Sequence, residues 1–206
     1  MKSTFAKAVL AAAALSISAC ATTSMVQVWR DPSYVAAPVH RILVVSVIPN
    51  DAYRAAFDNA TAQALASKGF SAVGASSLFP PGQLDKDVVV SYVKQQDIDL
   101  VVVQRITKQT EVQYNPPAVM YAPPPAYGGW YGYYGYGYGT VYAPGYYSDS
   151  TTVAAEVNVY AAKANPERLV WSGTSRTFNF QGAVEAAQSV AYTLLDDLIR
   201  AGILVR

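Results

Sequence analysis

The chain has 206 residues, and its 15 basic and 14 acidic side chains leave a formal net charge of +1, without the basic footprint of a nucleic-acid partner. Its single cysteine cannot form an intramolecular disulfide, and together with its single histidine it falls short of the usual ligand set of a zinc site. The composition therefore indicates neither nucleic-acid binding nor a metal, and the length favours one domain.

The first 19 residues have the pattern of a secretory signal peptide. Lys2 and Lys7 precede an apolar run that ends in small residues just before Cys20. A cationic start, an apolar stretch of ~7–15 residues and small residues at the cut are what export and cleavage require. The run is shorter than the ~20 residues of a membrane-spanning helix. We therefore expect residues 1–19 to be removed during export.

The sequence Ile17-Ser18-Ala19-Cys20 resembles the lipobox of bacterial lipoproteins. By this resemblance Cys20 becomes the new amino terminus and carries a diacylglyceryl thioether and an amide-linked acyl chain such as palmitate. A single acyl chain binds a membrane only marginally, at ~0.8 kcal/mol per buried CH₂, so several chains make a lasting anchor. Ala21 stands where Asp usually goes with inner-membrane retention, which favours the periplasmic face of the outer membrane. A soluble export signal with a chance cysteine is the alternative.

Residues 20–40 are expected to hold the lipidated cysteine and a tether, with an edge strand at residues 25–29. Trp29, Asp31 and Tyr34 follow the anchor closely in the sequence. Trp29 and Tyr34 are candidate interaction residues of a docking site near the membrane. The alternative is that Trp29 holds the edge strand on the sheet.

The next part of the chain alternates between strands and helices. Residues 41–48 are a continuous apolar run, typical of a strand covered on both faces. Asn50 can cap the helix that follows, because its side-chain oxygen accepts from first-turn amides, and Gly69 ends that helix. The remaining expected elements are a strand at residues 70–75, a helix at residues 85–96 and a buried strand at residues 98–103.

A polar alternation continues this third strand beyond Val103. From Leu100 to Tyr114 the strand would be ~50 Å long at ~3.3 Å per residue, whereas strands are usually ~17–20 Å long. We therefore expect it to bend, or to project from the sheet as an arm.

Residues 112–148 are an uncharged insertion, expected as a hairpin loop, that holds 11 of the 16 tyrosines. Tyrosine with glycine is typical of binding loops, because tyrosine offers a large contact area with few rotatable bonds. The alternative is a disordered low-complexity tip, since glycine and proline deny it regular structure. The candidate interaction residues in the insertion are Tyr127, Trp130, Tyr131, Tyr133, Tyr134, Tyr136 and Tyr138.

Regular elements are predicted again after the insertion. Alternating apolar residues predict strands over residues 153–161 and 168–180, and apolar spacing near 3.6 predicts a closing helix over residues 183–201. The order is βαβαβββα. We therefore expect an α/β fold (an α+β sandwich) with a mixed β-sheet, as a single domain over residues 41–206 that the insertion interrupts.

A set of residues spread over most of the mature chain carries a family resemblance: Trp29 to Tyr34, Arg41 to Val47, Arg54, Phe57, Asp58, Leu65, Gly69 and Leu169 to Ser172. In these residues the chain resembles a family of bacterial envelope lipoproteins whose domain has no assigned function. The resemblance implies a fold similar to the TolB amino-terminal and CsgG-like α/β domains, which serve in envelope assembly and secretion. A Tyr/Gly/Pro insertion at the same place is common in that family, whereas Asp58 stands where related chains often carry Glu. The family supplies no catalytic residue.

No nucleotide-binding loop and no G-x-S-x-G pattern is present. Solvation and capping account for the acidic pairs Asp97 with Asp99 and Asp196 with Asp197, and His40 is expected at the surface. We therefore expect a non-enzymatic, membrane-anchored lipoprotein without a cofactor that presents the tyrosine-rich insertion to a protein partner or to another copy of itself. Two alternatives stay open, namely binding of cell-wall or surface glycan and assembly as a subunit of a secretion-type oligomer.

Overall fold

The computed structural model describes residues 21–79, 84–111, 129, 132 and 151–205, and within these ranges the side chains of residues 108–111 and 151 are left aside. The elements are, in chain order, β1 (Thr22–Arg30), β2 (Arg41–Ser46), α2 (Asp51–Ser67), β3 (Ser71–Gly74), α3 (Ala75–Leu78), α4 (Lys86–Gln95), β4 (Leu100–Glu111), β5 (Thr151–Ala161), β6 (Arg168–Phe178) and α6 (Ala183–Arg200).

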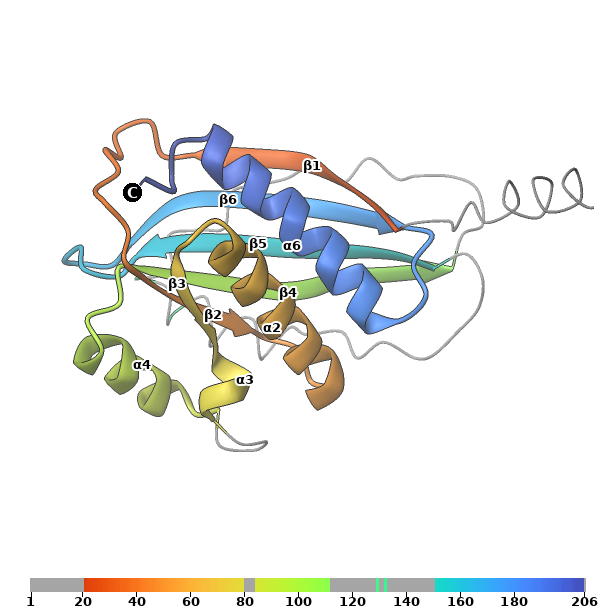
Figure 1. Cartoon of the computed structure of the whole chain (residues 1–206), viewed down its shortest axis with the longest axis horizontal. Helices are drawn as coiled ribbons and strands as arrows, with labels where there is room; N and C mark the ends of the chain where they lie inside the picture. Colours follow the sequence, from red (N-terminus) through yellow and green to blue (C-terminus); the bar gives the residue numbers. More distant parts are fainter. Residues whose placement is uncertain (1–20, 80–83, 112–128, 130–131, 133–150, 206) are drawn as a thin grey trace, which may run out of the picture.

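The described strands form one six-stranded sheet in the order β1-β6-β5-β4-β2-β3 (Figure 1). The strands β3, β2 and β4 are parallel to one another, and β4, β5, β6 and β1 are antiparallel. The predicted α/β fold with a mixed sheet is therefore confirmed. The strand order was not predictable from the sequence.

The parallel half of the sheet follows the apolar runs of the sequence. In its centre, Ile42 of β2 pairs with Ala72 of β3 on one side and with Leu100 of β4 on the other. The helix α2 begins where it was predicted, because Asn50 Oδ1 accepts a hydrogen bond of 3.0 Å from the backbone N–H of Tyr53. The strand β3 is shorter than expected, since Ala75 already begins the one-turn helix α3.

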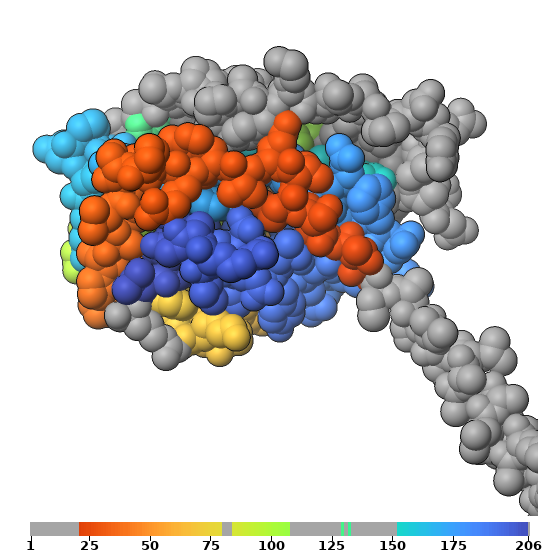
Figure 2. Space-filling model, turned by 90° about the horizontal axis from the view of Figure 1, so that it is seen from above, coloured from red at the N-terminus to blue at the C-terminus, as the bar shows by residue number. Residues whose placement is uncertain are grey.

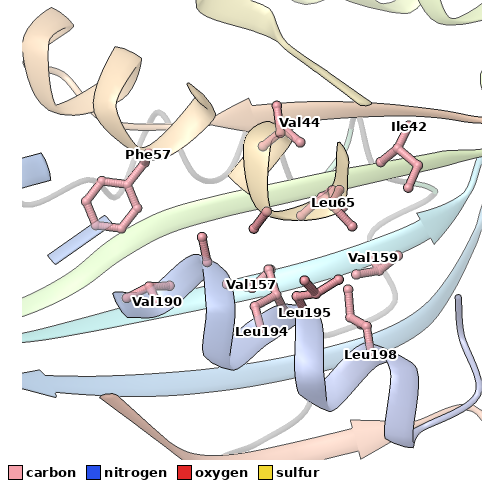
Figure 3. Close-up of a cluster of buried hydrophobic side chains, with 14 of the residues drawn as sticks. Ile42, Val44, Phe57, Leu65, Val157, Val159, Val190, Leu194, Leu195 and Leu198 are labelled. Carbon is pink, nitrogen blue, oxygen red and sulfur yellow. The ribbon is translucent and has the colours of Figure 1, made fainter. Parts of the chain in front are cut away.

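Helices cover both faces of the sheet. On one face, α2 and α6 pack on the sheet, and Figure 3 shows Leu194 and Leu198 of α6 beside Val157 and Val159 of β5. On the other face, α3 and α4 cover the parallel half, with Val89 of α4 among the buried side chains. Full burial of an aliphatic side chain contributes roughly 1.5–3 kcal/mol, so these two layers hold the sheet together.

The long third strand does not project on its own. β4 pairs with β5 along its whole length, from Leu100 opposite Ala161 to Glu111 opposite Thr151. The register shifts between Ile106 and Lys108, where an irregularity of this kind bends and twists a strand pair. The irregularity thus lies within the antiparallel part of the sheet, β1-β6-β5-β4, and β4 does not project as a free arm.

The predicted edge strand is present and starts earlier than expected. β1 runs antiparallel to β6 and lies at the edge of the sheet. Next to it on β6, a Cβ atom at Gly173 would lie 2.4 Å from Cη2 of Trp171 and 2.7 Å from Cε of Met25. Only glycine at this position leaves room for the buried Trp171 ring beneath the edge strand.

The two ends of the sheet differ in which strands begin and finish there. At one end, Thr22 pairs with Phe178, and Glu111 pairs with Thr151, so that β1 and β5 begin and β4 and β6 finish there. We call this the anchor end, and it lies at the right of Figure 1. At the opposite end, here called the far end, β1 finishes at Arg30 and β2 begins at Arg41.

Candidate interaction surface at the anchor end

The first described residue, Ala21, is fixed on helix α6. Its backbone N–H donates a hydrogen bond of 3.0 Å to Glu185 Oε1, and its carbonyl oxygen accepts one of 3.1 Å from Ser189 Oγ. Thr23 continues the contact with a hydrogen bond of 2.7 Å to Ser189 Oγ. The chain is therefore held in place from the residue that directly follows Cys20, and residues 22–30 belong to the sheet rather than to a tether.

Apolar side chains lie exposed around this fixed start. Phe178, the Cα partner of Thr22, is 36% exposed, and Val184 in the first turn of α6 is 61% exposed. The carboxylate of Glu185 accepts from the backbone N–H of Gln181 at 2.6 Å as well as from that of Ala21. The anchor end thus presents apolar surface beside a carboxylate that is already engaged by two backbone amides.

The tyrosine-rich insertion leaves the sheet at this same end. β4 finishes at Glu111 and β5 begins at Thr151, and these two residues are paired. Residues 112–150 therefore leave and return at neighbouring positions in the middle of the sheet. The predicted interaction residues Tyr127, Trp130, Tyr131, Tyr133, Tyr134, Tyr136 and Tyr138 lie outside the described residues, as does the predicted lipidation site Cys20.

A buried ion pair joins the two strands that carry the insertion. Arg105 of β4 donates to Glu156 Oε2 from Nε at 3.1 Å and from Nη2 at 2.8 Å. Asn158 Nδ2 donates to Glu156 Oε1 at 3.1 Å, and Asn158 Oδ1 is buried without a partner among the described residues. Arg105 and Glu156 are Cα partners, and because an unpaired charge is costly to bury, this largely buried pair favours the observed register of β4 with β5.

Trp29 and Tyr34 lie toward the far end of the sheet. Trp29 is half-buried on β1 opposite Ser172, and Tyr34 packs against the core. At ~3.3 Å per residue, the length of β1 puts them roughly 25 Å from the anchor end. The structure therefore does not bring them together with the start of the insertion, and a docking role for them stays a prediction.

The segment between β1 and β2 is closed by an ion pair with β6. Arg168 pairs with Asp31, which also accepts from the backbone N–H of Ser33 at 2.9 Å. Burial alone raises the pKa of the Asp31 carboxyl, but the hydrogen bonds from Ser33 and the charge of Arg168 outweigh it, so the pKa lies below its usual value. The residues Trp29 to Tyr34 of the family resemblance thus comprise the end of β1 and a turn that hydrogen bonds and an ion pair hold in place.

The acidic pair Asp97 and Asp99 also has a structural role at the far end. Lys163 Nζ lies 2.6 Å from Asp99 Oδ1 and 2.9 Å from Asp97 Oδ2. Asp99 Oδ2 accepts from the backbone N–H groups of His40 at 2.7 Å and Arg41 at 2.8 Å. Burial opposes ionisation of Asp99, yet these partners hold its pKa below the usual value. The pair fastens the start of β2 to the hairpin between β5 and β6.

A buried polar network that was not predicted from the sequence surrounds Asp58 of α2. Asp58 is fully buried, and its Oδ1 accepts from the backbone N–H of Ser46 at 2.7 Å while its Oδ2 accepts from that of Ser76 at 2.9 Å. Gln104 Nε2 donates to Ser46 Oγ at 2.8 Å. The network joins the carboxyl ends of β2 and β3 to α2. Asp58, Ser46 and Gln104 are fully buried, whereas Ser76 is half-buried.

Replacing Asp58 by asparagine is expected to change how stability depends on pH. Burial raises the pKa of Asp58 above 3.8 although its hydrogen bonds lower it, so the folded state holds the proton more tightly than the unfolded chain. Its contribution to stability is therefore full at low pH and is lost as the pH rises through the folded-state pKa. We expect the free energy of urea unfolding of the wild type, relative to that of Asp58→Asn, to be lower at about pH 7 than at about pH 4.

The control for this measurement is Asp87→Asn at the exposed start of α4. Identical pH dependence of the free energy of unfolding in the wild type and in Asp58→Asn would contradict a raised pKa of Asp58 in the folded state.

The described residues offer little for catalysis. None of them form a group of three or more His, Cys, Asp or Glu side chains that could hold a metal ion. Ser91-Tyr92-Val93-Lys94 matches the S-x-x-K pattern, which was not predicted as a site, and Ser91 and Lys94 are exposed on α4 with no hydrogen bond joining them. None of the helices in the described ranges combines the length and the apolar character needed to cross a membrane.

Comparisons with known proteins give structural similarity only. No family model and no curated protein matches the sequence. A PelC dodecamer structure from Paraburkholderia phytofirmans is 12% identical and covers 90% of this chain and 99% of that chain, with a TM-score of 0.46. Lipoprotein GNA1162 from Neisseria meningitidis is 14% identical and covers 78% of this chain and 99% of that chain, with a TM-score of 0.40. The hypothetical protein CT253 from Chlamydia trachomatis is 10% identical, with coverages of 81% and 96% and a TM-score of 0.38.

Proposed function

We propose that this protein is a non-enzymatic lipoprotein of the cell envelope, anchored through Cys20, that binds a protein partner or a second copy of itself through the tyrosine-rich residues 112–148. The lipobox and Ala21 favour the periplasmic face of the outer membrane. The observation that carries the proposal is the shared end of the sheet. β1 begins there two residues after Cys20, and the insertion leaves there between Glu111 and Thr151.

The spacing of the strands supports contact close to the membrane. β1 and β4 are separated by three strand intervals in the order β1-β6-β5-β4, which amounts to roughly 14 Å at ~4.8 Å per interval. A flexible chain of the length of residues 112–148 has a root-mean-square reach of ~30–37 Å. A lipid on Cys20 would therefore hold the tyrosines within a few tens of ångströms of the membrane surface.

The composition of the insertion favours a protein surface as its target. Tyrosine presents an apolar ring with a polar hydroxyl and loses little rotamer freedom on binding, and glycine lets the backbone conform to the partner. Residues 112–148 carry no charged side chain, so long-range electrostatic attraction does not guide binding. The contact is therefore expected to depend on shape and aromatic area and to resist salt.

In-cell photocrosslinking tests this function directly. A photoreactive amino acid at Tyr133 should capture one or more envelope proteins or a second copy of the chain, and the same group at Val35, which is 88% exposed toward the far end, serves as the matched control. The same set of products from both positions would count against the insertion as the binding element.

The same aromatic rings suit a glycan, which is the alternative binding partner. Sedimentation of the purified protein with peptidoglycan separates the two proposals. Pelleting that disappears when residues 115–147 are deleted would favour the glycan, and absence of pelleting would exclude peptidoglycan as the ligand.

The mass of the detergent-solubilised protein reports on self-association, because a protein that is monomeric at all concentrations does not present the insertion to a second copy.

A further inference from the structure

The anchor end leaves almost no free chain between Cys20 and the folded domain. The backbone N–H and carbonyl of Ala21 are both hydrogen-bonded to α6, so the first residue held on the domain directly follows Cys20. Consecutive Cα atoms are about 3.8 Å apart, so a lipid on Cys20 would be joined to the folded domain without a long tether. The membrane must then lie against the part of the domain from which β1 starts.

We propose that the anchor end, with Phe178 and Val184, lies directly on the lipid surface and holds the domain in one orientation. This inference rests on the lipid anchor of the proposed function and goes beyond it. In Figure 2 the start of β1, in red, lies beside the light-blue chain that holds the end of β6 and the start of α6. Phe178 is the partner of Thr22, and Val184 precedes Glu185, which accepts from Ala21, so both exposed side chains lie near the residue that follows Cys20.

The distribution of side chains along the sheet fits this orientation. Val184 is more than half exposed, although an isolated aliphatic side chain in the first turn of a helix gains nothing from water. In contrast, the ion pairs of Asp31 with Arg168 and of Asp99 with Lys163 lie at the far end. In this orientation Phe178 and Val184 face the lipid beside Glu185, whose carboxylate already accepts from two backbone N–H groups.

This orientation places the root of the tyrosine-rich insertion at the membrane. Glu111 and Thr151 lie at the same end of the sheet as Thr22, so the chain between them starts at the height of the lipid headgroups. Tyrosine and tryptophan favour this boundary because their rings are apolar at one end and polar at the other.

Fluorescence quenching on the full-length lipoprotein tests the orientation. Cys20 is the only cysteine, and lipidation occupies its thiol, so Val184→Cys and the far-end control Val35→Cys each provide a single site for a bimane label. The proteins are reconstituted in vesicles of phosphatidylethanolamine and phosphatidylglycerol. Nitroxide-labelled lipid should quench the label at position 184, and iodide should quench it about threefold or more weakly than the label at position 35.

Equal accessibility of the two labels to iodide, without lipid quenching at position 184, would overturn the proposed orientation. The mass of the amino-terminal peptide from the same sample shows whether Cys20 is lipidated, and so separates failure of the anchor from failure of the orientation. If Cys20 carries acyl chains but the label at position 184 is accessible, only the orientation fails. If Cys20 carries no lipid, the anchor and the orientation fail together.

Discussion

Replacing Cys20 by alanine is expected to abolish lipidation and to remove the protein from the outer membrane. Several acyl chains, at ~0.8 kcal/mol per buried CH₂, make a lasting anchor, whereas burial of Phe178 and Val184 adds at most roughly 1.5–3 kcal/mol each. We therefore expect the apolar anchor end to orient the domain but not to replace the proposed lipid on Cys20. Metabolic labelling with palmitate and membrane fractionation should show complete loss of label and no protein in the outer-membrane fraction.

The matched control for this experiment is Ala21→Asp, which leaves Cys20 in place. It should keep the palmitate label and shift the protein toward the inner membrane, because only the sorting residue has changed. Recovery of Cys20→Ala in the outer membrane at the level of the wild type would show that another part of the chain provides the attachment.

Deleting residues 115–147 is expected to abolish capture of the partner and to leave the domain folded. The pairs between β4 and β5 continue up to Glu111 with Thr151 and lie outside the deleted segment, in which the described Gly129 is buried. Shortening the connection from 39 residues to 6 lowers the entropy cost of loop closure by about 1.6 kcal/mol. The unfolding temperature should therefore stay constant or rise by a few degrees, while the products crosslinked from a photoreactive group at Ala21 are lost.

Two outcomes would speak against this account of the insertion. If a photoreactive group at Ala21 captures the same envelope proteins before and after the deletion, another surface binds them. If the deleted protein unfolds at a much lower temperature, residues 115–147 contribute to the fold rather than to recognition. A replacement of the same length by glycine and serine then separates loss of packing from loss of the tyrosines.

Local signals account for the parts of the fold that were predicted correctly. The Asn50 cap, the apolar run of β2 and the apolar spacing of α6 each depend on residues close in the sequence, where helix and strand physics acts directly. The start of α3 at Ala75 and the end of β6 before Asn179, which has a φ of 55°, were missed. Boundaries of this kind depend on single backbone angles rather than on periodicity.

Contacts between distant residues were beyond the sequence pattern. The hydrogen bonds of Ala21 join it to residues of α6 more than 160 positions away, and the sequence around Ala21 does not predict them. One signal for the buried network was available, because Asp58, Thr61 and Leu65 share a helix face at the spacing of a buried stripe. An acidic residue on such a stripe requires partners, and here Ser46 and Ser76 supply them.

The candidate surface was predicted in composition but not in position. The uncharged run with 11 of the 16 tyrosines is evident in the sequence. That Glu111 and Thr151, which flank this run, lie at the same end of the sheet as the start of β1 depends on the register of β1 with β6, of β6 with β5 and of β4 with β5, which no local pattern specifies. The same register puts Trp29 and Tyr34 toward the other end of the sheet, away from Glu111 and Thr151.

The most direct test of the shared end is a spacer between Cys20 and Ala21. About 25 glycine and serine residues would lift the domain from the membrane by roughly 25–30 Å without changing the lipid or the insertion. If anchor and insertion act together, the yield of crosslinks from Tyr133 to a membrane-bound partner should fall several-fold, while the fold and the palmitate label stay unchanged. An unchanged crosslink yield with the spacer in place would contradict the account.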